Sequence, residues 1–275
     1  MEYQEKFVAY LDVLGFMNLV RDSENGTGMP LPELVELLRL LGTSEDVDRL
    51  KKNGPVICPD STYIQRDLNF KLTQISDCVV ISSEVSPIGV INLINHCAQV
   101  VLRLLEKGIM CRGYVTKGLI YHTDSQFIGS GYFEAYSKEK KVKIFKRKTD
   151  EEGTPFVELD PTVCKFVNDC GDLCVKKMFS RFVIDDGEIL ALFPFQRLSH
   201  SFMIAGLGNK LDPQKEKESN HNLRLLIKKL KERITEFVDK SNLDAISKSK
   251  HYIKALDDQL VVCDKTDEMI DKFGI

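Results

Sequence analysis

The sequence predicts a mixed α/β protein, an α+β sandwich in which helices pack over one sheet, followed by C-terminal helices. Two observations support this fold class. Short apolar runs typical of buried strands alternate with longer amphipathic stretches typical of helices along most of the chain. Toward the C-terminus only amphipathic helical patterns remain.

The first elements are a strand and two helices. Residues 6–13 form a nearly continuous apolar run, which predicts a strand that is buried on both faces. Gly15 and Phe16 then begin a helix, and residues 25–30 form a loop. Pro32 suits the first turn of the next helix, whose apolar face consists of Leu34, Leu37, Leu38 and Leu41.

The middle of the chain predicts a hairpin, a helix and a long strand. We expect residues 52–68 to be irregular, and residues 69–76 and 78–83 to form a hairpin that bends near Asp77. A helix follows from Ser86-Pro87 to Lys107-Gly108, and a strand from Met110 to Ile120.

Shorter elements follow, and then the C-terminal helices. We expect a short strand at 126–129, a helix at 130–141, and strands at 155–158 and 189–193, with a turn at Asp185-Asp186-Gly187. Residues 209–220 are polar and lack periodicity, so they predict a linker or mobile loop, and amphipathic helices follow at 219–239 and 243–260. We therefore expect a catalytic domain at 1–208 and a helical extension packed on it at 209–275.

Composition is typical of a soluble globular protein. Hydrophobic residues make up 43% of the 275 residues and charged residues 29%, and the net charge of −3 gives no general case for nucleic-acid binding. We find no signal peptide and no uninterrupted apolar run of membrane-spanning length, and we expect a cytoplasmic protein without a membrane partner. The eight cysteines contain no C-x-x-C, so reduced thiols are favoured over a zinc site at Cys170 and Cys174.

Two aspartates are the first candidates for chemistry. Asp12 ends the first predicted strand, and Asp77 lies at the bend of the predicted hairpin. Two carboxylates that are brought together repel each other unless a cation neutralises them, and Mg²⁺ favours a pair of carboxylates together with substrate phosphates. The free N–H groups at the start of the helix after Asp12, with Gly15 permitting close approach, suit phosphate oxygens. The pattern thus suggests metal-dependent chemistry on a nucleoside triphosphate.

The spacing alone leaves a structural alternative open. Asp12 could instead cap a helix beginning at Val13 or Leu14, and Asp77 could simply shape a hairpin turn.

Four segments together resemble the class III nucleotidyl cyclases. Phe7–Phe16 looks like the first metal-binding segment of that family, and Lys71–Ser82 resembles its second metal-binding hairpin. Arg112–Gly118 and Phe127–Glu139 are similar to the later strand and to the strand-to-helix segment that follows it. The resemblance implies a cyclase-like mixed sheet and two divalent ions, Mg²⁺ or Mn²⁺, at each site. It also implies a head-to-tail homodimer with its sites at the subunit interface.

Four positions depart from the pattern of the purine-using members, two at base-reading residues and two at transition-state residues. Thr73 stands where purine-using members place a base-reading lysine, and Gln126 replaces their acidic partner. Their transition-state Asn and Arg align with Phe133 and Ser137. The Gly-x-x-Tyr-x-x-Ala-Tyr-x-x-Glu pattern of residues 129–139 instead resembles the pyrimidine cyclases of bacterial Pycsar antiphage systems, whose product, cyclic UMP or cyclic CMP, activates a separately encoded effector.

Site residues follow from both arguments. Asp12, Val13 and Asp77 are the expected metal-holding residues, and Asp12, Asp77 and Arg112 the expected catalytic residues. The expected substrate-binding residues are Leu14, Gly15, Phe16, Thr73, Tyr132 and Tyr136.

Several of these residues have plainer alternatives. Arg112 and Lys117 lie five residues apart on a strand, so their side chains point to opposite faces of the sheet. Arg112 is expected to contact phosphate or to have a structural role, and the alternative is that the two residues are a plain surface pair. Tyr132 and Tyr136 share a helix face. They could line the nucleotide site, lie at a subunit interface, or simply pack against the rest of the protein. Glu139 is expected to be a surface ion-pair partner. The basic stretch from Lys138 to Lys148 could face phosphates, but a solvated helix end and loop is favoured.

The leading hypothesis is a metal-dependent cyclase that converts UTP or CTP to the 3′,5′-cyclic monophosphate and pyrophosphate. The alternatives are a non-catalytic nucleotide-binding or regulatory module with a cyclase fold, and a cyclase that uses ATP or GTP.

Overall fold

The computed structural model describes residues 1–55, 68–195 and 212–272. The described chain divides into two compact units, Met1–Leu104 with Ile109–Pro194, and Leu105–Gly108 with Phe195–Ile275. The expected boundary between residues 208 and 209 lies outside the described residues, and so does most of the predicted irregular stretch at 52–68. The division into domains 1–208 and 209–275 stays a prediction.

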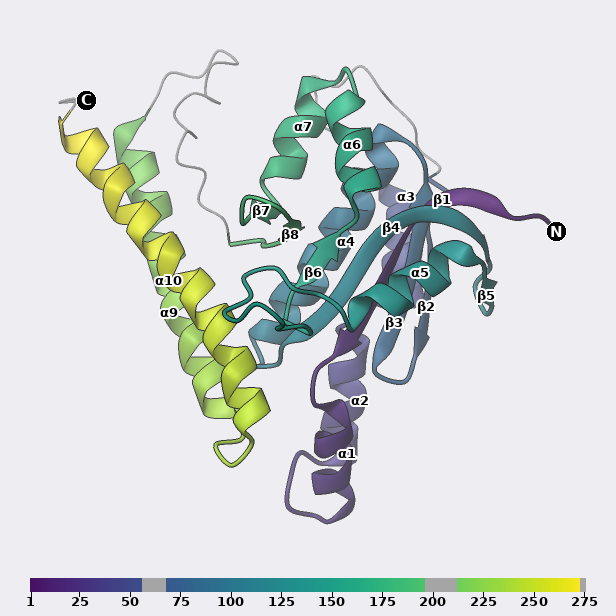
Figure 1. The fold of residues 1–275 in the computed structure, drawn as a ribbon, viewed down its shortest axis with the longest axis horizontal. Coiled ribbons are helices and arrows are strands. Elements are labelled where there is room, and N and C mark those ends of the chain that lie inside the picture. The colour runs from purple at the N-terminus through teal and green to yellow at the C-terminus, as the bar shows by residue number, and fades with distance from the viewer. Residues whose placement is uncertain (56–67, 196–211, 273–275) are drawn as a thin grey trace. The chain divides into compact units, whose positions relative to one another are not determined.

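One mixed sheet organises the first unit (Figure 1), with its strands in the order β2-β3-β1-β4-β6-β8-β7 and β5 paired to β4. The central strand β1 is antiparallel to both β3 and β4, and β4 is parallel to β6. The strands are β1 Gln4–Val13, β2 Lys71–Ile75, β3 Cys78–Glu84, β4 Cys111–His122, β5 Phe127–Ile128, β6 Val157–Leu159, β7 Val183–Asp185 and β8 Leu190–Leu192. The predicted fold class, a mixed sheet with helices packed over it, is confirmed.

Helices cover both faces of this sheet. Figure 1 shows α5 in front of the sheet and α4 behind it. Alternate side chains of β1 point to opposite faces; Val8 and Tyr10 join a buried cluster with Ala135 of α5, on what we call the α5 face. The helices of this unit are α1 Phe16–Glu24, α2 Leu31–Arg39, α3 Ser44–Asn53, α4 Pro87–Leu105, α5 Ser130–Glu139, α6 Pro161–Asp169 and α7 Leu173–Ser180.

Helix α4 is the apolar core helix of the unit. Within the described part of the chain it is the one helix whose length and hydropathy would suffice to cross a membrane, but 72% of its apolar window is buried inside the protein. Val90, Leu93, Ile94 and Cys97 all lie at 3% exposure or less. This burial is typical of a helix that packs on a sheet.

The second unit contains a pair of long helices, α9 Pro213–Phe237 and α10 Leu243–Lys272. They bury Ile227, Leu230 and Ile234 of α9, and Leu256, Cys263 and Ile270 of α10.

The expected linker at 209–220 is wrong for its described part, because α9 already begins at Pro213. Pro213 occupies the first turn, and the side chain of Asp212 accepts a hydrogen bond from the Lys215 N–H at 3.2 Å, which caps the helix. Helix α10 likewise extends twelve residues beyond the predicted end at 260, to Lys272.

Candidate functional site

Asp12 lies near the end of β1, and Asp77 lies in the hairpin turn just before the adjacent strand β3. Asp12 is the ninth residue of β1 and is paired with Cys78 of β3, while Asp77 lies in the tight turn between β2 and β3. The Val13 N–H donates a hydrogen bond to the Asp77 carbonyl oxygen at 3.0 Å. The fold therefore brings the two residues together, as the sequence predicted.

The structural alternative holds for one aspartate only. Helix α1 begins at Phe16 with Gly15 as its N-cap and has no side-chain cap, so the alternative that Asp12 caps a helix at Val13 or Leu14 is wrong. Asp77 does lie in the hairpin turn. Asp12 is thus a carboxylate at the end of a central strand with no capping role.

Negative charge gathers around Asp12. Burial, then Glu139, then Asp77 raise the pKa of Asp12 to about 7, while Arg112 and Lys140 partly oppose the shift. A carboxyl group with this pKa is only about half ionised at neutral pH. A bound cation would favour its ionised form, so the site has the electrostatics of a cation site.

The possible metal ligands are few. Among the described residues no group of three His, Cys, Asp or Glu side chains could hold a metal ion. Asp12, Asp77 and the main chain of Val13 remain, which fits Mg²⁺, an ion usually held by one or two carboxylates with the rest of its ligands from water and substrate phosphates. The residues present therefore fit the expected Mg²⁺ or Mn²⁺, with substrate supplying further oxygens.

The start of α1 is open beside the aspartates. Gly15 has a φ of +77°, which favours glycine, and no atom lies within 4 Å of the position that a side chain would take. The N–H of Val13 and that of Leu14 are already bonded, to Asp77 and to Met110 at 3.0 Å. Of the predicted phosphate-binding stretch 13–16, only the N–H groups of Gly15 and Phe16 are therefore available as donors.

Arg112 is committed to a buried ion pair. It is paired with Asp12 across β1 and β4, and its Nε donates a hydrogen bond to a carboxylate oxygen of Glu139. The side chain of Arg112 is 13% exposed and that of Glu139 1%. Glu139 is therefore not the surface partner that the sequence suggested. The four-residue spacing of Gly131, Ala135 and Glu139, all buried in α5, is the sequence signal that would have found it.

Three tyrosines form an aromatic cluster on the α5 face. Tyr132 and Tyr136 are stacked at 5.9 Å between ring centroids, and Tyr136 meets Tyr10 edge-on at 5.3 Å. Tyr10 precedes Asp12 by two residues on the same face of β1, so the cluster adjoins the aspartates.

Two other predicted residues lie elsewhere. The Thr73 hydroxyl is 3.1 Å from Nε2 of His122, whose Nδ1 is 2.8 Å from the Ser82 hydroxyl. Lys117 pairs with Glu5 at 3.1 Å. Thr73 thus belongs to a polar network of its own, apart from Asp12 and Asp77.

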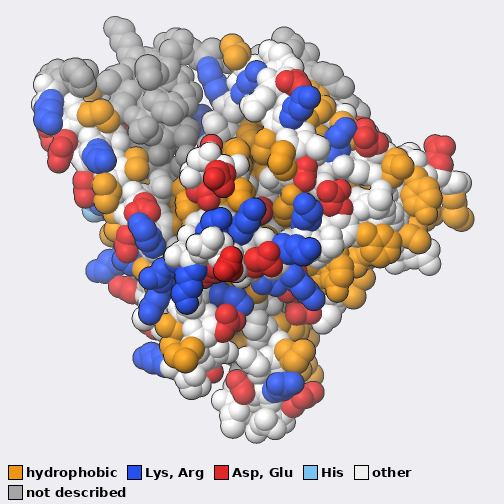
Figure 2. Space-filling model, viewed as in Figure 1, with side chains coloured by type: hydrophobic (Ala, Val, Ile, Leu, Met, Phe, Trp, Pro, Cys, Tyr) orange, Lys and Arg blue, Asp and Glu red, His pale blue; other side chains and the backbone are white. Residues whose placement is uncertain are grey.

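The basic stretch after α5 is mixed in charge. Figure 2 shows Lys and Arg side chains interspersed with Asp and Glu over the segment that follows α5. A cavity of about 1020 Å³ lies here, lined by residues that include Tyr114, Lys138, Glu158 and Asp160. The Tyr114 hydroxyl donates a hydrogen bond to Asp160 at 2.8 Å. Tyr114 is two residues from Arg112 on β4, which puts this cavity next to the aspartate site.

Within the described residues no disulfide joins the cysteines, which are Cys78, Cys97, Cys111, Cys164, Cys170, Cys174 and Cys263. In that part of the chain Cys170 and Cys174 belong to no group of three metal ligands. Cys58 lies outside the described residues.

Comparisons with known proteins found similarity only among solved structures. No protein-family model matches the sequence, and no curated protein matches it. The catalytic core of a rhodopsin-guanylyl cyclase with converted specificity, in complex with ATPalphaS, is similar with a TM-score of 0.40 and 13% identity, over 70% of this chain and 97% of that one.

Two further structures are similar to about the same degree. A class III adenylyl cyclase-like ATP-binding protein from Pseudomonas aeruginosa has a TM-score of 0.35 and 13% identity, over 60% of this chain and 35% of that one. A bacterial light-regulated adenylyl cyclase has a TM-score of 0.39 and 15% identity, over 75% of this chain and 58% of that one. In both cases the matched region spans less than two thirds of the other chain. Likenesses of this size do not identify a function.

Proposed function

We propose that this protein is a metal-dependent nucleotidyl cyclase that converts UTP or CTP to the 3′,5′-cyclic monophosphate and pyrophosphate. The observation that carries the proposal is the placement of Asp12 at the end of β1 next to Asp77 in the β2–β3 turn, beside the start of α1, which has no side-chain cap. Two carboxylates next to free N–H groups suit a divalent cation and a triphosphate.

The residues at this site have separate roles in the proposal. Asp12, Asp77 and the Val13 main chain would hold Mg²⁺ or Mn²⁺, two ions per site, which would lower the pKa of the attacking hydroxyl and neutralise charge on the leaving pyrophosphate. The Gly15 and Phe16 N–H groups bind phosphate oxygens. The ribose 3′-oxygen bonds to the α-phosphorus, the bond from that phosphorus to pyrophosphate breaks, and the hydroxyl proton passes to solvent.

Arg112 and the aromatic cluster complete the site in this proposal. Glu139 holds the Arg112 guanidinium next to Asp12, where its charge favours bound phosphate. Tyr132 and Tyr136 present aromatic faces for the base, and Tyr136 is 40% exposed.

The preference for a pyrimidine rests on Thr73. Residue 73 is a threonine where purine-using members of the family place a base-reading lysine, and its hydroxyl lies 3.1 Å from Nε2 of His122. With the resemblance of residues 129–139 to the Pycsar enzymes, this favours UTP or CTP. The product would then act as a second messenger in antiphage defence, through an effector encoded separately.

A homodimer is part of the same proposal. Exposed apolar side chains gather at α5, β5 and the adjoining strand β4, namely Leu119, Ile128, Phe133 and Tyr136, and Figure 2 shows hydrophobic surface in this area. We call these four residues the apolar patch. A second copy of the chain covering the patch would bring residues of both copies to one site, with residues 1–208 as the catalytic domain and 209–275 as its helical extension.

One observation favours a non-catalytic nucleotide-binding module instead. Phe133 is 58% exposed, and the Ser137 hydroxyl donates a hydrogen bond to the Glu134 carbonyl at 3.0 Å. Neither side chain can supply the hydrogen bonds of the asparagine and arginine that the cyclase family uses in these positions. Such a module would bind a triphosphate without converting it.

One assay separates these functions. The purified protein is incubated with Mn²⁺ and all four triphosphates in competition, and the products are identified by mass spectrometry. We expect cyclic UMP or cyclic CMP from the wild type, none from Asp12→Ala, and normal amounts from Asp48→Ala, an exposed aspartate of α3. If cyclic AMP or cyclic GMP were the only product, the protein would be a purine cyclase and the pyrimidine assignment would be wrong. Nucleotide binding without any product would establish the non-catalytic module.

A further inference from the structure

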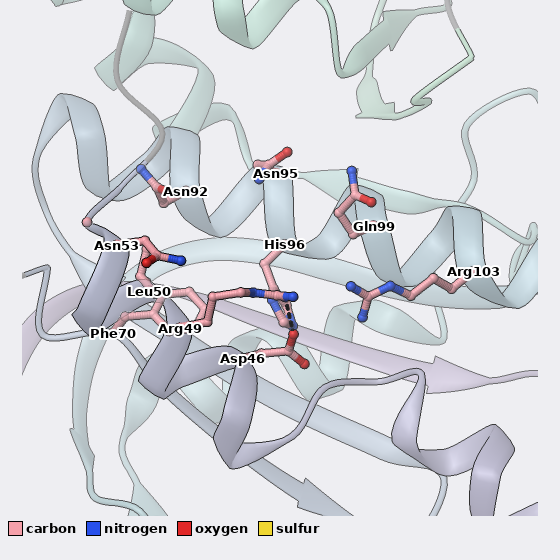
Figure 3. A pocket seen from close by; sticks show the side chains of 11 residues that line it. Asp46, Arg49, Leu50, Asn53, Phe70, Asn92, Asn95, His96, Gln99 and Arg103 are labelled. Atoms are coloured by element: carbon pink, nitrogen blue, oxygen red, sulfur yellow. Dashed lines mark hydrogen bonds and ion pairs between the residues drawn. The ribbon is translucent and has the colours of Figure 1, made fainter.

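A second pocket lies on the opposite side of the sheet from Asp12. Figure 3 shows it between α3 and α4. It has a volume of about 260 Å³ and is lined by Asp46, Arg49, Leu50, Asn53, Gly54, Phe70, Asn92, Asn95, His96, Gln99 and Arg103. We call it the α3–α4 pocket.

The polar side chains of α4 all face this pocket. Helix α4 is otherwise apolar. Its polar residues Asn92, Asn95, His96, Gln99 and Arg103 each lie three or four residues from another member of the set, which places them along one stripe. Five hydrogen-bonding side chains on one stripe of a core helix give the pocket a floor of donors and acceptors. Phe70 adds an apolar wall, and its ring meets His96 edge-on at 5.6 Å.

The charge in the pocket is positive. Asp46 accepts a hydrogen bond from Arg49 through one carboxylate oxygen and from the Thr43 N–H at 3.0 Å through the other, so its charge is already balanced. Arg103 is half-buried and makes no ion pair within the described part of the chain, and Figure 3 shows its guanidinium directed along the pocket toward Arg49. Among the described residues, the Arg103 guanidinium is therefore the pocket's one cation without a counter-charge.

His96 does not add to that charge. Burial lowers the pKa of His96, so its imidazole is neutral at pH 7. Its Nε2 lies 3.4 Å from the Leu41 carbonyl, to which only a protonated nitrogen can donate, so Nδ1 is left as an acceptor. A ligand that fits would thus carry one oxyanion for Arg103 and polar groups for the amides and Nδ1.

We propose that the α3–α4 pocket binds a small polar oxyanion, a phosphate ester or a carboxylate, independently of the nucleotide site. Arg103 is the primary anchor because a free guanidinium matches the geometry of phosphate and carboxylate. Asn95, Gln99 and Arg49 surround the rest of the ligand.

The test uses the full chain and two simple anions. Inorganic phosphate and acetate are titrated at constant ionic strength, and binding is followed by ¹H–¹⁵N NMR of the Asn and Gln side-chain amides and the Arg Nε–H groups. We expect saturable chemical-shift changes at Asn95, Gln99 and Arg103. The anion that binds more tightly shows whether the pocket prefers a phosphate or a carboxylate. Potassium chloride at the same ionic strength shifts none of them.

Variants assign the binding to this pocket. Arg103→Gln and Gln99→Glu, which places a carboxylate at an exposed position, are each expected to weaken anion binding at least about tenfold. Arg39→Gln, an exposed arginine of α2 outside the pocket, leaves it unchanged. The pocket variants should also retain triphosphate turnover, which separates this proposal from the proposed function.

Two results would overturn the proposal. One is no saturable shift at these side chains with either anion. The other is binding that both pocket variants leave intact, because the anion would then lie elsewhere, for instance at the start of α1.

Discussion

At the scale of single residues, the site depends on how its charges are balanced. The negative charges of Glu139 and Asp77 raise the pKa of Asp12, and the positive charges of Arg112 and Lys140 lower it. Of these, Glu139 is the most buried, and its partner is Arg112. The Arg112–Glu139 pair therefore both supports α5 on the sheet and fixes a positive charge beside the aspartates.

Removing one partner of this pair should be costly. Arg112→Gln leaves the Glu139 carboxylate buried without its counter-charge, which typically costs about 3–5 kcal/mol. Urea denaturation measures the loss. The matched control is Lys117→Gln on the same strand, whose partner Glu5 is 55% exposed, and there we expect less than about 1 kcal/mol. Equal effects of the two variants would contradict the buried pairing.

The sequence predicted some of these residues and missed others. Asp12 and Asp77 were predictable because an apolar strand and a hairpin fixed their places, and antiparallel pairing brought them together. The burial of Glu139 was not predictable, because it depends on how closely α5 approaches the sheet. The engagement of Thr73 by His122 was also missed, since these two residues are 49 positions apart in sequence.

At the scale of elements, two glycines let α5 lie close to the sheet. A side chain at Gly118 of β4 would come within 2.8 Å of the Gly131 Cα in α5. The two backbones therefore touch, and this contact sets where Tyr132, Tyr136 and Glu139 lie over β1.

A methyl group at this contact should displace the helix. We expect Gly118→Ala to destabilise the protein by about 1–3 kcal/mol in thermal denaturation, because backbone cannot yield as a flexible side chain does. Gly171→Ala is the control, because no atom lies within 4 Å of its added carbon. If Gly118→Ala were as stable as this control, α5 would not be held as described.

Most elements were predictable, and the misses have identifiable causes. Apolar periodicity placed β1, β3, α4 and β4 within a few residues. The charged start of α9 has little apolar periodicity, so its cap at Asp212 and Pro213 was the only signal of a helix. Helix α3 was missed for a similar reason, because Val47 is its one buried residue.

At the scale of the whole molecule, a buried histidine should make stability depend on pH. Burial, followed by Lys6 and Lys71, lowers the pKa of His122 from 6.5 to about 3. Between these values the unfolded chain binds a proton that the folded chain does not. The stability from neutral His122 is therefore complete above pH 6.5 and is lost as the pH falls toward 3.

The comparison of two variants isolates this contribution. One such group lowers the free energy of unfolding by about 1.4 kcal/mol per pH unit in that window. Urea denaturation between pH 4 and pH 7 should show a shallower slope for His122→Gln than for the wild type. His221→Gln, at an exposed histidine of α9, should keep the wild-type slope. An unchanged slope in His122→Gln would show that His122 is not buried in its neutral form.

Assembly is the second property of the whole molecule. Phe133→Glu places a charge in the apolar patch, and we expect it to convert the proposed dimer to a monomer in sedimentation velocity and to abolish the proposed turnover. Leu173→Glu, an exposed apolar side chain of α7 outside the patch, should leave the dimer intact. A wild-type monomer with full turnover would contradict a site shared between subunits.

Binding of Mn²⁺ in the presence of UTP or CTP tests the central claim most directly. Electron paramagnetic resonance counts the bound ions in the wild type, Asp12→Asn and Asp77→Asn, each of which removes one charge with little change in shape. We expect each substitution alone to weaken Mn²⁺ binding by at least about tenfold, because both carboxylates would contact the same ions in the proposed site. Undiminished Mn²⁺ binding in either variant would show that the two aspartates do not share a cation, and the account of the site would fail.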